Sequence, residues 1–328
     1  GLVGSEMCIR DSLYLMLLER REQATISLAA TINKARVIDA PLTADAPIAP
    51  KSPMIYAGSL FMACIMTIAL ILFKDMFRTK ISSISEVEAI QLPIVGTIPL
   101  DKEQIGVTEG KNGLMEESFR RLRSNLRFLT EKGDEKCILI TSATSGEGKS
   151  FISINLALSF AFLGCRVLIV GLDIRRPRLA EHFHIQNRQG ITNFLAGNEV
   201  KPESIIYPSG MHELLSVVPS GPVPPNPAEL LERERLKDAF TYFRKHFDYI
   251  IVDSAPTGLA SDTLSLSKVT DFTLYVCRIN YTYKNVLPEI VNTEHTGRLN
   301  HISLIVNGGN LAEKKYGYGY GYGYGHTH

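Results

Sequence analysis

The chain has 328 residues, of which 45% are hydrophobic, and a formal net charge of +1 at pH 7. This length predicts one large or two modest domains with a substantial core, and the near-neutral charge argues against a strongly basic nucleic-acid-binding protein. The cysteines form no C-x-x-C pair and show no metal-like spacing to histidine, which is typical of buried thiols in a reducing compartment; they are Cys8, Cys64, Cys137, Cys165 and Cys277.

The first part of the chain predicts a helix. Residues 1–12 lack an initiator methionine and resemble a translated sequencing adapter, so we leave this leader out of the fold prediction. Between residues 13 and 37, apolar side chains such as Leu17 alternate with charged ones such as Arg20. This pattern favours an amphipathic helix that packs as part of a coiled coil over residues 13–40.

A connector and an apolar segment follow. Residues 41–53 contain four prolines, which oppose helix and sheet alike. Residues 54–73 then run for 20 residues without a charge, which is long enough to cross a membrane, although a buried helix of a soluble domain gives the same pattern. Basic residues beginning at Lys74 outnumber the single lysine, Lys51, that lies as close on the other side. The positive-inside rule therefore predicts that the chain after Lys74 is cytoplasmic.

Residues 74–115 are expected to be a linker with a docking strand, because they contain a short apolar run closed by proline. Residues 116–130 predict a helix. This helix places Glu117, Arg120 and Arg123 on one face at a spacing of three. Taken alone, such a face is usually a solvated one with salt bridges.

A glycine-rich loop lies between an apolar run, residues 137–141, and an apolar-periodic run, residues 151–163, which predicts strand, loop and helix. Its glycines let backbone N–H groups approach phosphate oxygens, and the helix adds its positive end. We interpret it as a P-loop with Ala143 in place of the first glycine; the alternative is a strand-to-helix turn without a ligand. The residues expected to bind nucleotide here are Ser145, Gly146, Glu147, Gly148, Lys149, Ser150 and Phe151.

Two of these side chains have a defined chemistry. Lys149 is expected to reach the β- and γ-phosphates of ATP as a point charge. The Ser150 hydroxyl is expected to complete the shell of a Mg²⁺ ion that bridges them.

From residue 137 onward, apolar strands alternate with helical stretches. This alternation predicts an α/β fold, a P-loop NTPase-like, doubly wound and mostly parallel sheet that is covered on both faces and binds ligands at the carboxyl ends of its strands. The strands expected after the P-loop are residues 167–171, 213–218, 249–253, 272–277 and 302–306. Asp173 lies just past the first of these strands, and Asp253 ends the third.

These two aspartates are candidates for metal binding and catalysis. Asp253 ends an apolar strand, where a carboxylate can hold Mg²⁺ directly or through water; an aspartate that caps the following turn is the alternative. Asp173 can take the proton of an incoming hydroxyl or order Mg²⁺-bound water, and Arg175 can offset phosphate charge. The catalytic candidates are thus Lys149, Asp173 and Asp253, and the metal candidates are Ser150, Asp173 and Asp253.

Four stretches together carry a resemblance to a known family: residues 146–150, 172–177, 221–231 and 252–253. The set resembles the bacterial tyrosine kinases and, more specifically, the Wzc-type polysaccharide copolymerases. In that family a proline-flanked second transmembrane helix joins an extracytoplasmic coiled coil to a cytoplasmic kinase. The resemblance implies that a first membrane span and most of an outer domain precede residue 13 and are missing here.

The resemblance also implies a function. It predicts an ATP- and Mg²⁺-dependent autokinase over residues 116–312 that phosphorylates its own tail, residues 313–328, and controls capsular or exopolysaccharide polymerisation and export. The implied partners are a homo-oligomeric ring, assembled through the helix with Glu117, Arg120 and Arg123, a cognate tyrosine phosphatase and the polysaccharide machinery. The implied location is the bacterial inner membrane, with the kinase in the cytoplasm. The implied phosphate acceptors alternate with glycine and are Tyr316, Tyr318, Tyr320, Tyr322 and Tyr324.

One departure from the family leaves alternatives open. Members commonly carry two aspartates in an Asp-x-Asp-x-Arg segment, and Gly171 stands here in place of the first. Asp173 or Asp253 must then substitute as proton acceptor, or catalysis is impaired. A structural copolymerase with impaired catalysis and a membrane-associated P-loop ATPase switch are the alternatives, and the tail can also be read as a low-complexity segment without phosphate.

Overall fold

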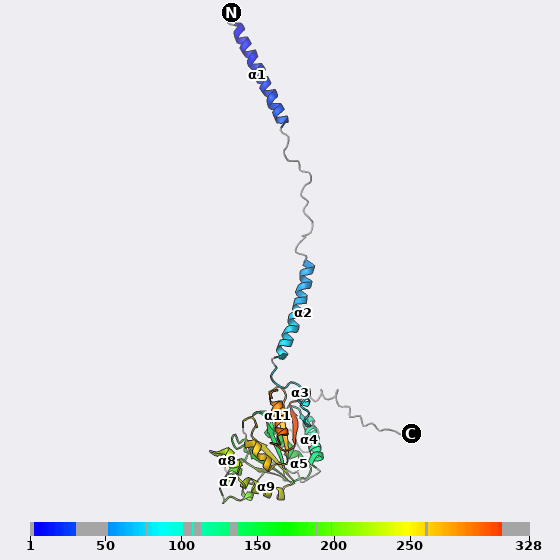
Figure 1. Cartoon of the computed structure of the whole chain (residues 1–328), viewed down its shortest axis with the longest axis vertical. Helices are drawn as coiled ribbons and strands as arrows, with labels where there is room; N and C mark the ends of the chain where they lie inside the picture. The colour runs from blue at the N-terminus through cyan, green and yellow to red at the C-terminus, as the bar shows by residue number, and fades with distance from the viewer. Residues whose placement is uncertain are drawn as a thin grey trace, which may run out of the picture. The chain divides into compact units, whose positions relative to one another are not determined.

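The structure is a computed structural model of the chain (Figure 1). It divides into two units, residues 1–72 and 73–328. Each unit is described by itself. The structure describes residues 3–30, 52–76, 78–100, 107, 113–130, 137–187, 189–197, 199–259 and 262–309.

The first unit contains helix α1 (Val3–Ala29) and most of helix α2 (Ser52–Met76). The helix predicted from residue 13 is confirmed over its described part and begins earlier, at Val3. Within α2, Pro53–Lys74 is 22 residues of high hydropathy with none of the window buried, long and apolar enough to cross a membrane. The predicted span of residues 54–73 lies inside this helix, whereas nearly all of the proline-rich connector lies outside the described residues.

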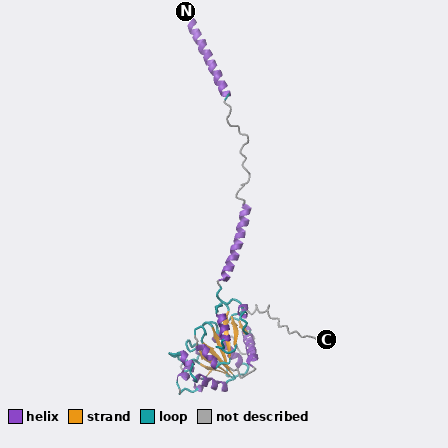
Figure 2. Ribbon diagram, viewed as in Figure 1, coloured by secondary structure: helices purple, strands orange, loops and turns teal. Residues whose placement is uncertain are grey.

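Within the described part of the second unit, eight strands form one sheet in the order β1-β8-β7-β2-β6-β3-β5-β4. Figure 2 shows the strands in orange with helices around them. All neighbours pair in parallel except β4 and β5, so the predicted doubly wound, mostly parallel sheet is confirmed. The strands are β1 (Ile94–Ile98), β2 (Cys137–Ser142), β3 (Val167–Leu172), β4 (Tyr207–Pro208), β5 (Leu215–Val218), β6 (Tyr249–Ser254), β7 (Phe272–Arg278) and β8 (Ile302–Asn307).

Two hydrophobic clusters cover the two faces of this sheet. In β2, Ile138 and Ile140 belong to the cluster with α4 and α5, whereas Leu139 belongs to the cluster with α7, α8, α9 and α11. Both faces are therefore buried, which explains why the strands are continuous apolar runs. The helices are α3 (Ile84–Glu88), α4 (Leu114–Thr130), α5 (Lys149–Ala161), α6 (Leu179–His182), α7 (Ile191–Ala196), α8 (Pro227–Leu231), α9 (Arg235–His246), α10 (Asp262–Ser265) and α11 (Val286–His295), with 3₁₀ turns at Pro202–Ile205 and Leu266–Lys268.

The segment after the apolar helix is more than a linker. Strand β1, expected as a docking strand, is the edge strand of the sheet and pairs in parallel with β8. Ile81, Val87 and Ile98 are fully buried in the hydrophobic clusters. The residues predicted as a linker therefore contribute to the core of the second unit, and the division between the two units falls at Phe73.

Candidate active site

The loop between β2 and α5 has the backbone of a P-loop. Gly146 and Gly148 adopt φ values of +89° and +101°, a region that favours glycine. A Cβ at Gly146 would lie 2.6 Å from the Tyr281 hydroxyl, and one at Gly148 would overlap the Asn307 amide. Both glycines are therefore required by conformation and by close contacts, as the sequence predicts.

Residues at or just after the carboxyl ends of β7 and β8 donate hydrogen bonds to the carbonyls of this loop. The Tyr281 hydroxyl donates to Ser145 O (2.9 Å), and the Arg278 guanidinium donates to Gly146 O (2.8 Å). The Asn307 amide donates to the carbonyl of the next residue, Glu147 (2.8 Å). These bonds satisfy the carbonyl oxygens of three successive residues of the turn, 145–147.

The Glu147 side chain does not line the cleft. Its buried carboxylate accepts hydrogen bonds from Thr144 N (2.9 Å) and from the Thr282 hydroxyl. The prediction that Glu147 binds nucleotide is thus restricted to its backbone, because its side chain instead ties the loop to the interior.

Lys149 and Ser150 begin α5 at the base of the cleft. The Lys149 Nζ donates to the Ser142 hydroxyl (3.1 Å), and Lys149 is only 8% exposed. Burial lowers the pKa of Lys149, against the attraction of Asp253, Asp173 and Glu147, which favours the charged form. Lys149 thus places a buried cation in the cleft, where it can pair with the negative charge of a phosphate.

The two aspartates come together at the carboxyl edge of the sheet. Gly171 in β3 pairs with Asp253 in β6, and the Asp173 N–H donates to Asp253 O (3.1 Å). Asp253 is 4% exposed and accepts from the Ser150 hydroxyl (2.7 Å). Burial raises the pKa of Asp253 to about 6, although the hydrogen bond from Ser150 and the charge of Lys149 oppose this change.

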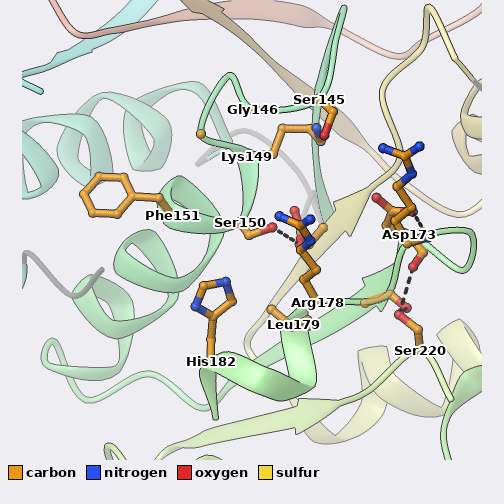
Figure 3. Close-up of a pocket in the computed structure, with 14 residues that line it drawn as sticks. Ser145, Gly146, Lys149, Ser150, Phe151, Asp173, Arg178, Leu179, His182 and Ser220 are labelled. Carbon is orange, nitrogen blue, oxygen red and sulfur yellow. Dashed lines mark hydrogen bonds between the residues drawn. The ribbon is translucent and has the colours of Figure 1, made fainter. Parts of the chain in front are cut away.

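These groups line one cleft of about 740 Å³, part of which is open to solvent (Figure 3). Ser150 and Asp253 offer adjacent oxygen ligands of the kind that Mg²⁺ prefers. Among the described residues no group of three His, Cys, Asp or Glu side chains is placed to hold a metal ion.

Arg175 is not one of the residues that line the cleft. Its guanidinium pairs with the buried Asp262 carboxylate at 2.7 Å. The predicted contact of Arg175 with phosphate is therefore not supported by its position. Arg176 and Arg178, from the same basic run, line the cleft instead.

Sequence reasoning missed several cleft residues. His182 and Leu179 of α6 line the cleft beside Arg178 (Figure 3). Ser220, which follows β5, donates to Gly171 O (2.9 Å). The run of basic residues beginning at Arg175 was a usable signal for Arg176 and Arg178, whereas nothing local in the sequence indicates Ser220.

Gly171, where the family resemblance led us to expect an aspartate, itself lines the cleft. A Cβ at this position would lie 2.8 Å from the Ser220 hydroxyl and 3.2 Å from a Leu179 methyl group. The space next to Gly171 is thus already filled by side chains, and a carboxylate here requires Ser220 to move.

The three charged residues of α4, the helix predicted to assemble a ring, lie in different surroundings. Glu117 pairs with Arg120 (3.2 Å) and with Arg121 (2.9 Å) on an accessible surface. Arg123 turns inward and donates to the Ser159 carbonyl in α5. Of the three, Arg123 is thus engaged inside its own subunit. The five tail tyrosines lie outside the described residues.

Comparison with known proteins follows the same division of the chain. A G-rich domain model, GNVR, matches residues 5–76, and an AAA domain model matches residues 135–271. The chain is 32% identical over 219 residues to the tyrosine-protein kinase YwqD of Bacillus subtilis, covering 66% of this chain and 91% of that protein. The chain belongs to the bacterial tyrosine-protein kinases.

Two further members show how the bacterial tyrosine-protein kinases align with it. The tyrosine-protein kinase ptk of Acinetobacter johnsonii is 29% identical over 318 residues, covering 92% of this chain but 42% of that protein. The kinase domain of the Escherichia coli tyrosine kinase ETK superposes with a TM-score of 0.62 at 26% identity, covering 74% of this chain and all of that domain. The chain thus spans less than half the length of the Acinetobacter relative and nearly all of the Bacillus one.

Proposed function

We propose that this chain is a membrane-anchored, ATP-dependent protein-tyrosine kinase that transfers the γ-phosphate of ATP to tyrosines of its own tail. One observation carries the proposal: Lys149, Ser150, Asp173 and Asp253 come from three separate segments and line a single cleft. Membership of the bacterial tyrosine-protein kinases supports the same reaction.

The geometry supports a division of roles for phosphoryl transfer. The Lys149 ammonium binds the β- and γ-phosphates, and the P-loop backbone N–H groups cradle them. Ser150 and Asp253 would hold Mg²⁺, which offsets phosphate charge when bound. Asp173 accepts the proton of the incoming tyrosine hydroxyl. The Ser150 hydroxyl donates to Asp253 and not to Asp173, whose carboxylate accepts from Arg176 N, so Asp173 is the better placed of the two carboxylates to take this proton.

The surrounding proposals concern the whole protein. Helix α2 anchors the chain in the bacterial inner membrane, with the kinase in the cytoplasm, since the basic residues follow the apolar span. Phosphorylation of Tyr316, Tyr318, Tyr320, Tyr322 and Tyr324 regulates capsular or exopolysaccharide polymerisation and export, and a tyrosine phosphatase reverses it. These roles rest on the family and on the sequence of the tail.

Assembly into a homo-oligomeric ring is proposed through the exposed part of the α4 face. Arg123 is bonded to Ser159 in α5, whereas Arg120 pairs with Glu117 of its own helix, so Arg120 is the residue chosen for charge reversal. Arg120→Glu should shift the protein toward monomer in light scattering. An unchanged mass would count against this interface.

The experiment that tests the kinase proposal is mass spectrometry of the purified chain after incubation with Mg²⁺ and ATP. Phosphotyrosine should appear on the tail. Nucleotide binding without any phosphotyrosine would overturn transfer to tyrosine and favour the second candidate, a scaffold or ATPase switch. That candidate has one specific observation in its favour, the absence of a carboxylate at Gly171.

A further inference from the structure

The chain just after α2 is joined to a loop next to the P-loop. Ile81 N donates to Thr282 O (2.8 Å), and Asn280 N donates to Ile81 O (2.7 Å). Lys80 and Tyr283 form an antiparallel bridge between the same two segments. Residues 79–81 and the loop at 280–284 are therefore held together by their backbones.

The same loop is also hydrogen-bonded to the P-loop. The Tyr281 hydroxyl donates to Ser145 O, and Arg278, three residues earlier, donates to Gly146 O. The Tyr281 hydroxyl also packs against Gly146, where a Cβ would lie only 2.6 Å from it. A short chain of contacts thus runs from residues 79–81 through Tyr281 to the phosphate-binding turn.

A pocket that is partly open to solvent lies beside this chain of contacts. Its volume is about 490 Å³, and we call it the juxtamembrane pocket; it is lined by Arg78, Thr79, Lys80, Ser82 and Asn280. Two cations, two hydroxyl-bearing side chains and an amide are donors of the kind that bind phosphate oxygens.

Lys80 belongs to both the pocket and the contact with the loop. Its Nζ lies 5.6 Å from the centre of the Tyr281 ring and 5.7 Å from that of Tyr283, within cation–π range. The nearby Glu86 carboxylate is paired with Lys284 at 3.0 Å. This neighbouring acid is thus paired with Lys284, which is not one of the residues that line the pocket.

The position of the pocket along the chain points to the source of the anion. Arg78 follows Lys74, the end of the apolar span, by four residues, which can extend at most ~14 Å. If α2 crosses the membrane, Arg78 and Lys80 therefore lie close to the lipid headgroups. Cations just cytoplasmic of a span are attracted by anionic lipids.

We propose that the juxtamembrane pocket binds the phosphate of an anionic phospholipid, and that its occupancy tightens nucleotide binding through Tyr281. The bound anion fixes Lys80, Lys80 fixes the Tyr281 ring, and the Tyr281 hydroxyl holds Ser145 in the phosphate-binding conformation. Because the P-loop is then already ordered, nucleotide binding costs less conformational entropy. The coupling is reciprocal, so nucleotide must tighten the lipid contact by the same factor. This inference rests on the nucleotide binding proposed above.

The test uses the full chain in vesicles of phosphatidylcholine alone and of phosphatidylcholine mixed with phosphatidylglycerol. The Kd of a fluorescent ATP analogue should be about fivefold lower, or more, in the anionic vesicles. Inorganic phosphate added to the neutral vesicles should not reproduce the change. If inorganic phosphate does reproduce it, the pocket takes free anions and the lipid assignment is wrong.

Variants separate anion binding from coupling. Lys80→Gln with Arg78→Gln should abolish the difference between the two vesicles. Tyr281→Phe keeps the ring under Lys80 but removes the hydroxyl bond to Ser145, so phosphatidylglycerol should still bind while the change in Kd is lost. Tyr283→Phe is the matched control, because Tyr283 also lies beneath Lys80, and it should keep the full change.

The outcomes distinguish this inference from the proposed function. Native mass spectrometry of the detergent-solubilised chain measures retained phosphatidylglycerol without nucleotide, and this lipid should be lost in the Arg78/Lys80 variant. Retention in that variant overturns the pocket, and a full Kd change in Tyr281→Phe overturns the coupling. A chain that retains the lipid but binds no nucleotide leaves the pocket standing and contradicts the proposed function.

Discussion

The two sides of the cleft are held in different ways. The P-loop wall, residues 145–150, is fixed by Tyr281, Arg278 and Asn307, which lie more than 130 residues away in the chain. The β3 wall, residues 171–182, keeps two of its arginines exposed at the cleft. The first wall is thus preorganised for phosphate, whereas the second is where this chain departs from its family.

This difference has a physical reason. A phosphate cradle works only if several N–H groups hold one geometry before the ligand arrives, so the loop needs support from outside itself. Groups that meet an incoming tyrosine chain must remain accessible. The predictions below test whether the two walls divide the work in this way.

The largest effect is expected on the P-loop wall. Lys149→Met keeps the bulk of the side chain and removes the cation that faces the phosphates, so autophosphorylation should collapse. Burial disfavours the charged form of Lys149 whereas Asp253, Asp173 and Glu147 favour it, so the effects of removing the cation on stability oppose each other and the fold should survive. Phosphotyrosine blots and thermal unfolding measure the two effects. Undiminished phosphotyrosine would remove the P-loop from the mechanism.

A somewhat smaller effect is expected for the carboxylate of the β3 wall. Asp173→Asn should lower the transfer rate at least ~10²-fold, the lower range for loss of a general base. An asparagine oxygen can still accept the bond from Arg176 N, now 3.0 Å from the carboxylate, so the turn should persist. Single-turnover rates with saturating ATP measure the effect, and nucleotide affinity is the control. A variant as fast as the parent would contradict the role of Asp173.

Neighbouring arginines of the β3 wall should separate stability from activity. Arg175→Gln leaves the Asp262 carboxylate, 4% exposed, without its partner, and should cost about 1–2 kcal/mol of unfolding free energy, a value reduced from that of buried pairs because Arg175 is 42% exposed. Arg176→Gln should leave stability unchanged and lower kcat/KM.

Chemical denaturation and steady-state kinetics on the same preparations measure this contrast. A loss of activity confined to Arg175→Gln at full stability would restore the original prediction that Arg175 contacts phosphate.

Much of the fold was predictable because its signals are local. The apolar runs of β2, β3, β6, β7 and β8 are buried on both faces, and each was predicted to within about one residue of its bounds. The two-residue strand β4, which pairs antiparallel with β5, carries no such signal. The glycine pattern similarly predicted the P-loop, since glycine is the residue that most readily adopts the positive φ values found at Gly146 and Gly148.

The site was predicted where function depends on the backbone and missed where it depends on partners. Glu147 and Arg175 stand in the motifs, yet Thr282 and Asp262 decide where their side chains point. These partners are 135 and 87 residues away in the chain, so no local sequence pattern predicts the contacts. Ser220 was missed for the same reason.

The smallest effect tests the residue at which the β3 wall departs from the family. Gly171→Asp alone should change the transfer rate little, because its Cβ meets the Ser220 hydroxyl at 2.8 Å and the carboxylate cannot settle freely. Ser220→Ala removes that hydroxyl, together with its bond to Gly171 O, and alone should slightly lower the rate. Combining the two should raise the rate severalfold above the parent, since a second carboxylate then faces the cleft beside Asp173. A double-mutant cycle on single-turnover rates isolates this coupling. If the effects of the two changes on the transfer rate are merely additive, the Ser220 hydroxyl is not what prevents a carboxylate at position 171 from acting. The glycine at this position must then be explained by the tyrosine acceptor rather than by packing in the β3 wall.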